Sequence, residues 1–425
     1  MKQVLFPYGK NKLSGIFDDA ELVGVLESAI NDYKTELSCE ELVREAIKNP
    51  VGTERLSELA RDKKNIVIIA SDHTRPVPSK VIMPAVLEEI RSTNPNANIT
   101  ILIATGCHRG TTKEELISKF GEEIVENENI YIHDCDEREK LVNIGTLPSG
   151  GECEINKIAI DADLLIAEGF IEPHFFAGFS GGRKSVLPGI ASRNTVLSNH
   201  CSEFINSENA RTGKLNDNPV HTDMLWAAKT ANLKFIINVV LNAEKEVLFA
   251  TAGDPEKAHK SGTDFLSALC GVNAVEADIA ISTNGGYPLD QNIYQAVKGM
   301  TAAEATVKKD GVIIMLASST DGTGGDHFYH QVADEKDVTK SMSDILKRGR
   351  NETIPDQWEA QILLRILMKA TVIYISELPD SLIESMHMIP SHSVEEAVLK
   401  AKQILNMDKV KIVAIPDGVS VIVKN

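Results

Sequence analysis

The chain has 425 residues, enough for two or three domains. Its formal net charge of −17 argues against general nucleic-acid binding, because proteins of that class present a basic surface. No apolar run reaches the roughly 20 residues that a membrane-spanning helix requires, and the segment MKQVLFPYGKNK lacks the apolar stretch of a secretory signal. We therefore expect a cytoplasmic protein that contacts neither membrane nor nucleic acid.

The six cysteines are scattered along the chain without a CxxC pair. In a cytosolic protein this spacing favours free thiols over a disulfide framework or a zinc ribbon. The cysteines are Cys39, Cys107, Cys135, Cys153, Cys201 and Cys270.

Short apolar runs alternate with helical patterns. The runs occupy residues 65–70, 98–104, 162–170, 235–241, 277–282, 311–316, 371–376 and 411–415. Continuous Val, Ile and Leu runs separated by helices are typical of strands buried on both faces of mostly parallel sheets. After the second run, Thr111 and Thr112 each precede a glutamate by three residues, which predicts a helix N-terminus.

We predict two α/β domains with mostly parallel sheets and an active site in the cleft between them. The first domain covers residues 1–268 and the second covers residues 274–406, with a hinge near 268–275. The tail has the pattern of two strands around Pro416-Asp417-Gly418. We predict that residues 409–425 return to the first domain and pair with the N-terminal strands.

Polar loops follow three of the predicted strands. They are SDHTRP at 71–76, TGCHRG at 105–110 and IEPH at 171–174. A single strand-end histidine is more often structural than functional. Because parallel strands of one sheet end at the same edge, three such loops in one domain favour a shared site.

The loop GFSGGRKS at 178–185 invites comparison with the phosphate-binding motif GxxxxGK[ST]. Arg183 stands where that motif requires glycine, so the match fails at a defining position. The glycines indicate either close approach of the backbone to a ligand or a tight surface turn. Lys184 is a natural point of covalent attachment, because burial favours the reactive neutral amine.

His200, in the segment SNHCSEF, is either a surface histidine or a metal ligand. The sequence has no HExxH or HxH spacing, so a metal at this position would need ligands that the protein does not supply. No GxGxxG follows a predicted strand, and a dinucleotide held in the Rossmann manner is therefore not expected.

In the second half, the segment 282–299 places a strand end, a glycine turn and a helix in succession. Asp290 or Asn292 is the predicted N-cap. One helix face then carries Gln291, Tyr294, Gln295 and Lys298. That face is either exposed to solvent or turned toward a site. Farther along the chain, Trp358 is by default a residue of the hydrophobic core.

Five segments together resemble the nickel-pincer lactate racemase family over essentially the whole chain. They are SDHTRPVPS at 71–79, ATGCHR at 104–109, EGFIEPHFFAGFSGGRKSVLPGI at 168–190, STNGGYPLDQNIYQAVKG at 282–299 and IPDQW at 354–358. The resemblance implies a racemase that interconverts D- and L-lactate by hydride transfer through pyruvate. Its implied cofactor is nickel(II) held in a pyridinium-3,5-bisthiocarboxylic acid mononucleotide, which is covalently attached at Lys184.

The resemblance also implies roles for individual residues. His108 and His174 match the two general acid/base histidines, and His200 matches the nickel ligand. The matching cofactor-binding residues are Asp72, His73, Thr74, Arg75, Lys184 and His200. The matching substrate-binding residues are Arg75, Gln295, Lys298 and Trp358.

This chemistry suits the residue types. Taking the Cα hydrogen as hydride while a base removes the hydroxyl proton avoids a carbanion, and two histidines supply a base for each enantiomer. The expected partners are a small 2-hydroxyacid and the enzymes that build the cofactor. Three alternatives remain: a racemase of another 2-hydroxyacid, a phosphoryl-transfer enzyme using the GGRKS loop, and a non-catalytic small-molecule sensor.

Overall fold

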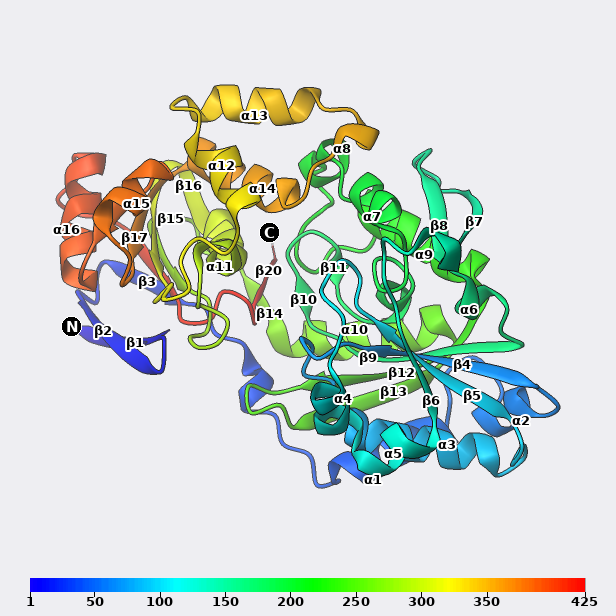
Figure 1. Ribbon diagram of the computed structural model, residues 1–425. Helices are drawn as coiled ribbons and strands as arrows, with labels where there is room; N and C mark the ends of the chain where they lie inside the picture. Colours follow the sequence, from blue (N-terminus) through cyan, green and yellow to red (C-terminus); the bar gives the residue numbers. More distant parts are fainter. Residues whose placement is uncertain (425) are drawn as a thin grey trace. The chain divides into compact units, whose positions relative to one another are not determined.

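The computed structural model describes residues 1–424 and divides the chain into two compact units (Figure 1). The central unit comprises Ile30–His200 and Ser207–Leu269. The terminal unit comprises Met1–Ala29, Cys201–Asn206 and Cys270–Asn425. Each unit contains one six-stranded sheet, and parallel pairing dominates in both, which confirms the predicted α/β class with mostly parallel sheets.

The sheet of the central unit has all but one of its strands in parallel; only the edge strand β13 runs antiparallel to its neighbour. In spatial order the strands are β13 (Val247–Gly253), β12 (Leu233–Leu241), β9 (Leu164–Phe170), β4 (Asn65–Ser71), β5 (Asn98–Ala104) and β6 (Asn129–Ile132). Every residue of β9 is buried, as expected for a central strand covered on both faces. The predicted strands at 65–70, 98–104, 162–170 and 235–241 are thus confirmed.

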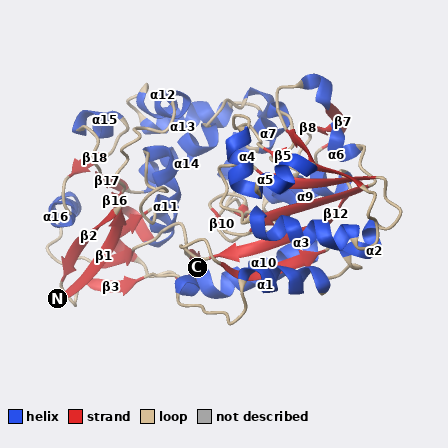
Figure 2. Cartoon of the chain, turned by 60° about the horizontal axis from the view of Figure 1, so that its bottom comes forward, coloured by secondary structure: helices blue, strands red, loops and turns tan. Residues whose placement is uncertain are grey.

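Helices flank this sheet on both sides (Figure 2). They are α1 (Cys39–Lys48), α2 (Leu56–Ala60), α3 (Ser79–Arg91), α4 (Lys113–Phe120), α5 (Glu122–Asn127), α6 (Lys157–Ile160), α7 (Arg193–Asn199), α9 (Pro219–Thr230) and α10 (Pro255–Cys270). The smaller elements are β7 (Leu141–Thr146) with β8 (Glu152–Asn156), β10 (Pro173–His174) with β11 (Gly178–Phe179), and the 3₁₀ helices η1 (Ala29–Asn31), η2 (Arg138–Lys140) and η3 (Gly182–Ser185).

The sheet of the terminal unit is parallel throughout. In spatial order its strands are β18 (Ile389–Ser391), β17 (Thr371–Ile375), β16 (Val307–Leu316), β15 (Ala277–Thr283), β19 (Ile412–Ile415) and β3 (Leu22–Val25). Two small pairs accompany it, the hairpin of β1 (Lys2–Tyr8) with β2 (Asn11–Phe17) and the parallel pair of β14 (Gly271–Asn273) with β20 (Ile422–Lys424). Its helices are α8 (Ser202–Asn206), α11 (Ile293–Thr306), α12 (Asp326–Ala333), α13 (Val338–Lys347), α14 (Gln357–Lys369), α15 (Asp380–Ser385), α16 (Val394–Leu405) and η4 (Arg350–Glu352).

The two chain ends lie in the terminal unit, so the prediction that residues 1–268 and 409–425 form one domain is wrong at both termini. Strand β19 lies between β15 and β3, and the tail pairs with β3 and β14 rather than with β1. Phe6 of the N-terminal hairpin is buried in the same core cluster as Ile279 and Ile412. The continuously apolar sequence of β19 predicts a strand in the interior of a parallel sheet. It does not specify which of the two similar sheets contains the strand, and the prediction chose the wrong one.

Capping side chains fix where the helices near the predicted loops begin. Thr112 caps α4 in a capping box with Glu115, whereas Thr111 does not cap it. Asn292 caps α11 by accepting a hydrogen bond from the backbone N–H of Gln295 at 2.9 Å. Within residues 1–424, the helices are all too short or too polar to cross a membrane.

Candidate active site

The carboxyl ends of β9, β4 and β5 are adjacent, because these three parallel strands are neighbours in the central sheet. The loops that follow them contain Asp72, His108 and His174. The expectation that these loops share one edge of a sheet is therefore confirmed, and ligand sites in open α/β sheets form at such edges.

Asp72 and His108 form a close pair. Nδ1 of His108 donates to Oδ2 of Asp72 over 2.8 Å, and the hydroxyl of Thr74 donates to Oδ1 over 2.7 Å. Burial acts to raise the pKa of Asp72, but the hydrogen bonds from His108 and Thr74 outweigh it and leave the pKa below its usual value. An ionised Asp72 fixes the proton of His108 on Nδ1, so Nε2 carries the lone pair that can accept a proton.

The rest of the first loop points to other partners. Nδ1 of His73 lies 3.1 Å from the hydroxyl of Thr111 and 3.6 Å from a carboxylate oxygen of Glu115, at the start of α4. Arg75 is exposed, and its charge helps to lower the pKa of Asp72. In the first loop, Asp72 thus pairs with His108, Arg75 is an exposed cation, and His73 contacts the start of α4.

His174 and Lys184 meet through the short β10–β11 pair, which folds the third loop back on itself. Nε2 of His174 lies 3.0 Å from Nζ of Lys184, and Nδ1 of His174 accepts a hydrogen bond from the backbone N–H of Ala177 over 3.2 Å. An imidazole that accepts at Nδ1 carries its proton on Nε2. Nε2 then donates to Lys184, which requires a lysine nitrogen with a lone pair, and the hydrogen-bond pattern therefore favours the neutral amine.

Phe176 contacts the ring of His174 and also that of His200. Its ring centroid lies 4.6 Å from that of His174 and 5.1 Å from that of His200, both in edge-to-face geometry. Nζ of Lys184 lies 5.8 Å from the centre of the same ring. Phe176 thus brings two histidines and the lysine into one group on an apolar surface.

His200 is buried at the C-terminal end of α7, and its Nδ1 donates to the carbonyl of Val196 over 2.9 Å. Burial lowers the pKa of His200 to about 3. The imidazole is therefore neutral, with its lone pair on Nε2, which is the form that binds metals. Within residues 1–424, the one group of three potential metal ligands is Asp134, Cys135 and Asp136, which excludes His200.

The glycines beside Lys184 serve the packing of the protein itself. Gly181 has a φ of 77°, and a side chain there would lie 2.8 Å from Oδ1 of Asn238. The N–H of Gly182 donates to the same oxygen over 2.8 Å. Because this amide already bonds to Asn238, the loop does not present its backbone to a phosphate as a phosphate-binding loop does.

Arg183 holds this loop from inside. Its guanidinium is buried and donates to the carbonyl of Ala177 over 2.8 Å and to that of Gly181 over 3.2 Å. Burial lowers the pKa of Arg183 to about 9. Arg183, which stands where a phosphate-binding motif has glycine, thus holds this loop in place through hydrogen bonds to its backbone.

The predicted substrate-side residues belong to the terminal unit. Nζ of Lys298 donates to Oε1 of Gln295 over 2.5 Å, and Nε1 of Trp358 donates to the hydroxyl of Tyr294 over 3.1 Å. Burial raises the pKa of the adjacent Glu359 to about 8, although the charge of Lys298 opposes the shift. Gln291 precedes the first residue of α11, so it is not on the helix face predicted for it.

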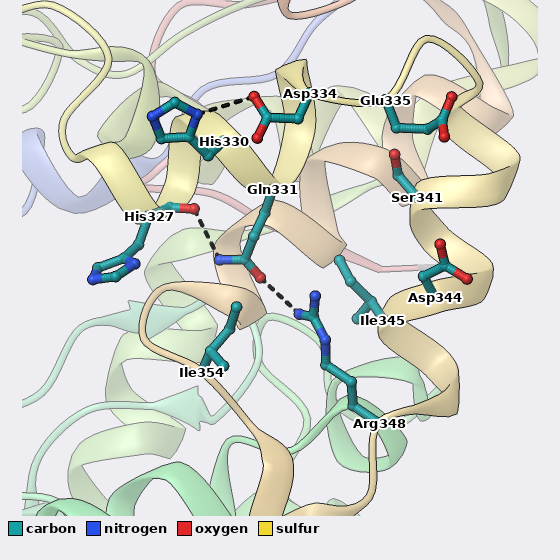
Figure 3. Close-up of a pocket in the computed structure, with 10 residues that line it drawn as sticks. All are labelled: His327, His330, Gln331, Asp334, Glu335, Ser341, Asp344, Ile345, Arg348 and Ile354. Carbon is teal, nitrogen blue, oxygen red and sulfur yellow. Dashed lines mark hydrogen bonds and ion pairs between the residues drawn. The ribbon is translucent and has the colours of Figure 1, made fainter.

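A separate cavity of about 310 Å³ lies among α12, α13 and the loop residue Ile354, which precedes α14 (Figure 3). Gln331 there donates to the carbonyl of His327 and accepts from Arg348, so the lining is tied together by its own hydrogen bonds. None of the predicted site residues lines it.

Sequence reasoning missed Phe176 and the buried role of Arg183. It also missed Glu168 of β9, which is buried and accepts a hydrogen bond from Ser79 over 2.5 Å. The pair of aromatic residues that directly follows His174 in the sequence could have indicated the role of Phe176. Nothing in the sequence indicated that Arg183 and Glu168 are buried, since charged residues are exposed by default.

Known proteins match the chain over its whole length. Residues 8–213 match the lactate racemase N-terminal domain, and residues 272–423 match the lactate racemase C-terminal domain. Lactate racemases from Thermoanaerobacterium thermosaccharolyticum and Lactiplantibacillus plantarum are 56% and 54% identical to the chain, each over 100% of both proteins.

Solved structures agree with this assignment. The lactate racemase apoprotein from T. thermosaccharolyticum superposes with a TM-score of 0.96 at 55% identity, covering 100% of both chains. A Thermotoga maritima protein has a TM-score of 0.65 at 20% identity and covers 92% of this chain and 100% of its own, which indicates a shared fold alone. The chain belongs to the lactate racemase family.

Proposed function

We propose that this racemase interconverts D- and L-lactate, with His108 and His174 moving the hydroxyl proton and Lys184 carrying a covalently attached nickel-containing pyridinium mononucleotide. The observation that carries the proposal is the group formed by Lys184, His174, Phe176 and His200. The similarity to two lactate racemases over the full chain supports lactate as the substrate.

The residues present fit such a cofactor. An amine held neutral by His174 is the nucleophile that an amide-type linkage requires. Neutral His200 offers one nitrogen ligand, and a single protein ligand suits a metal whose other ligands belong to the cofactor itself. When bound, the cofactor supplies a hydride-accepting ring whose reactivity the metal tunes. We place Asp72, His73, Thr74 and Arg75 in the loop that contacts it.

His108 accepts the hydroxyl proton of one enantiomer on Nε2. The carboxylate of Asp72 then stabilises the imidazolium that forms and keeps the ring in one orientation. His174 serves the other enantiomer, since racemisation returns hydrogen to the opposite face of Cα. To act as a base from Nε2 it takes the tautomer with its proton on Nδ1, the reverse of the one in which Nε2 donates to Lys184. Each turnover thus uses both histidines, one as base and the other as acid.

Four side chains bind the substrate in this proposal. Arg75 and Lys298 are the cations for the carboxylate, and Gln295 and Trp358 complete the binding residues. The hydrogen bond from Lys298 to Gln295 fixes the ammonium before substrate arrives. We further propose that the protein works in the cytoplasm, where other enzymes build the cofactor.

Phosphoryl transfer is not favoured by the loop geometry. The N–H of Gly182 bonds to Asn238, and the N–H of Lys184 bonds to the carbonyl of Gly181 over 3.2 Å. Only the short 3₁₀ helix Gly182–Ser185 follows the glycines, so there is no long helix whose N-terminus would face a phosphate.

Cofactor attachment is tested by intact mass and peptide mapping. Protein made in a host without the cofactor-building enzymes should be folded, nickel-poor and inactive, with an unmodified Lys184 peptide. Protein from the native host should gain several hundred daltons on that peptide, roughly the mass of a mononucleotide. Lys184→Arg should abolish the gain, and Lys157→Arg, a change at an exposed lysine, should not. Full racemase activity in unmodified protein would rule out this cofactor.

The histidine pair is tested by kinetics. We expect His108→Ala and His174→Ala each to lower kcat by roughly 10²–10⁴-fold, the usual contribution of a positioned acid or base. Asp72→Asn should act in the same direction, because an amide donates to Nδ1 and reverses the tautomer of His108. The exposed His330–Asp334 pair, 3.0 Å apart, provides matched controls in His330→Ala and Asp334→Asn. Equal losses in the control pair would contradict the assignment.

The same Asp72 variant has a pH signature. Because the fold lowers the pKa of Asp72, its ionised form stabilises the protein above the unfolded value of about 3.9. That stabilisation is lost as the pH falls through the lower folded pKa. In urea unfolding, the free energy of unfolding of wild type should therefore exceed that of Asp72→Asn by less and less as the pH is lowered from 6 toward 3. A difference that stays constant with pH would show that the fold does not lower the pKa of Asp72.

The substrate is tested with a panel of 2-hydroxyacids assayed by chiral chromatography. We expect lactate to be racemised faster than phenyllactate or malate. Lys298→Gln should raise KM or lower kcat for lactate by at least tenfold while leaving thermal stability nearly unchanged, because it removes a charge that binds the carboxylate. Faster racemisation of a bulkier acid would show that lactate is not the preferred substrate, without contradicting the proposed type of reaction.

A further inference from the structure

Two cysteines line one cavity beside the candidate active site. The cavity has a volume of about 530 Å³ and is lined by Cys107, His108, Cys135 and Arg193, among others. Strands β5 and β6 are parallel neighbours, with Ile103 opposite Ile132, and the two cysteines follow shortly after these strands. Adjacent strand ends therefore bring together two thiols that are far apart in the sequence.

The two thiols differ in character. A hydrogen bond from Cys135 lowers the pKa of Cys107, and the charge of Arg193 acts in the same direction. The same hydrogen bond, together with burial, raises the pKa of Cys135. Cys107 is also the more exposed of the two. This asymmetry suits a nucleophilic thiolate with a neighbouring thiol, the arrangement of a reactive cysteine and its resolving partner.

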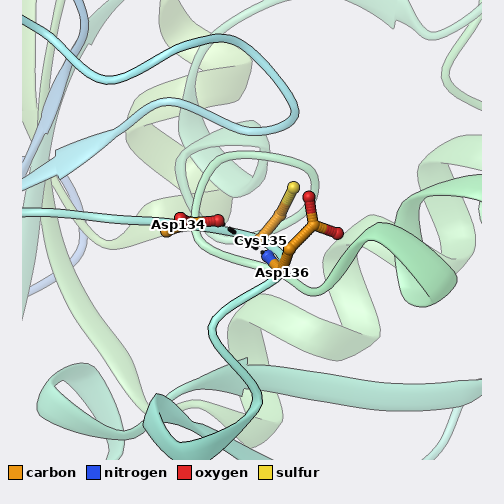
Figure 4. Close-up of side chains that lie close together, drawn as sticks. All are labelled: Asp134, Cys135 and Asp136. Carbon is orange, nitrogen blue, oxygen red and sulfur yellow. Dashed lines mark hydrogen bonds between the residues drawn. The ribbon is translucent and has the colours of Figure 1, made fainter.

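Asp134, Cys135 and Asp136 also lie close enough to suggest a metal site, since their ligand atoms are within 4.8 Å of one another (Figure 4). However, both carboxylate oxygens of Asp136 pair with Arg193, at 2.8 and 2.7 Å. One oxygen of Asp134 accepts the backbone N–H of Asp136 over 2.9 Å. A cation placed here would face a guanidinium, so the surroundings favour thiol chemistry over metal binding.

We propose that Cys107 and Cys135 form a redox-active dithiol that hydroperoxides oxidise to a disulfide. The Cys107 thiolate attacks the O–O bond of the peroxide, forming a sulfenic acid and, after protonation, releasing water or an alcohol. The thiol of Cys135 then attacks Sγ of Cys107, forming the S–S bond and expelling water. Two electrons and two protons leave the thiols, the peroxide is reduced, and a dithiol reductant reverses the change.

A consequence for catalysis rests on the proposed function. Cys107 directly precedes His108, whose contact with Asp72 positions the imidazole. A crosslink to Cys135 constrains the backbone at Cys107, and we expect it to disturb that contact. The racemase is then inhibited by peroxide and restored by a dithiol.

The test is non-reducing peptide mapping of the full-length protein after a brief hydroperoxide pulse and alkylation. Wild type should yield a Cys107–Cys135 peptide pair two hydrogens lighter than the reduced peptides. Before oxidation, Cys107 should alkylate several-fold faster at neutral pH than Cys39, which is also partly exposed. Cys39→Ser should leave the crosslink intact. Cys135→Ser should leave Cys107 as a sulfenic acid that dimedone traps.

Three results would overturn the proposal. One is the absence of the crosslink in wild type under conditions that oxidise Cys39. Another is alkylation of Cys107 no faster than that of Cys39. The third is one zinc ion per chain that copurifies and protects both thiols, which would establish a metal site instead. These readouts need no active enzyme, so a failure of the racemase assignment leaves them unaffected.

The regulatory consequence is measured on cofactor-loaded protein. Racemisation should fall in proportion to the crosslinked fraction and recover with dithiothreitol, and Cys107→Ser protein should resist the pulse. Full racemase activity in crosslinked wild type would show that the disulfide does not disturb the contact between His108 and Asp72.

Discussion

A buried guanidinium, that of Arg183, fixes the segment that carries Lys184. Arg183 donates to the carbonyls of Ala177 and Gly181, and so fixes the loop between His174 and Lys184 from within. The N–H of Ala177, placed by this loop, donates to Nδ1 of His174 and sets its tautomer. That tautomer presents a proton to Lys184, which favours the neutral amine. One buried side chain thereby links the packing of the loop to the chemistry of its lysine.

The two candidate acid/base histidines are fixed by different means. His108 is oriented by a carboxylate whose charge the fold preserves, whereas His174 is oriented by a backbone amide and by the rings of Phe175 and Phe176. His200 is kept neutral by burial and is oriented by a carbonyl. Three histidines of the central unit are thus oriented in three different ways by their surroundings, because the partner of one ring nitrogen decides what the other nitrogen can do.

Much of the architecture was predictable from sequence, because apolar runs such as 65–70 and 277–282 have one physical solution, a strand covered on both faces. The convergence of Asp72, His108 and His174 followed from the same rule. The placement of the chain ends did not, since the run at 412–415 fits a central position in either sheet equally well. Nor did the burial of Arg183 or the meeting of Cys107 with Cys135, because both depend on how loops fold after the strands end. The roles of individual residues came from the resemblance to known racemases.

The most direct test of the account follows the hydrogen on Cα. In this account the histidines handle only the hydroxyl proton, and the Cα hydrogen never exchanges with water. L-Lactate deuterated at Cα should therefore be converted, in ordinary water, to D-lactate that retains its deuterium, as measured by chiral separation and mass spectrometry. D-Lactate with solvent hydrogen at Cα would show proton abstraction and would contradict the roles assigned to His108, His174 and Lys184.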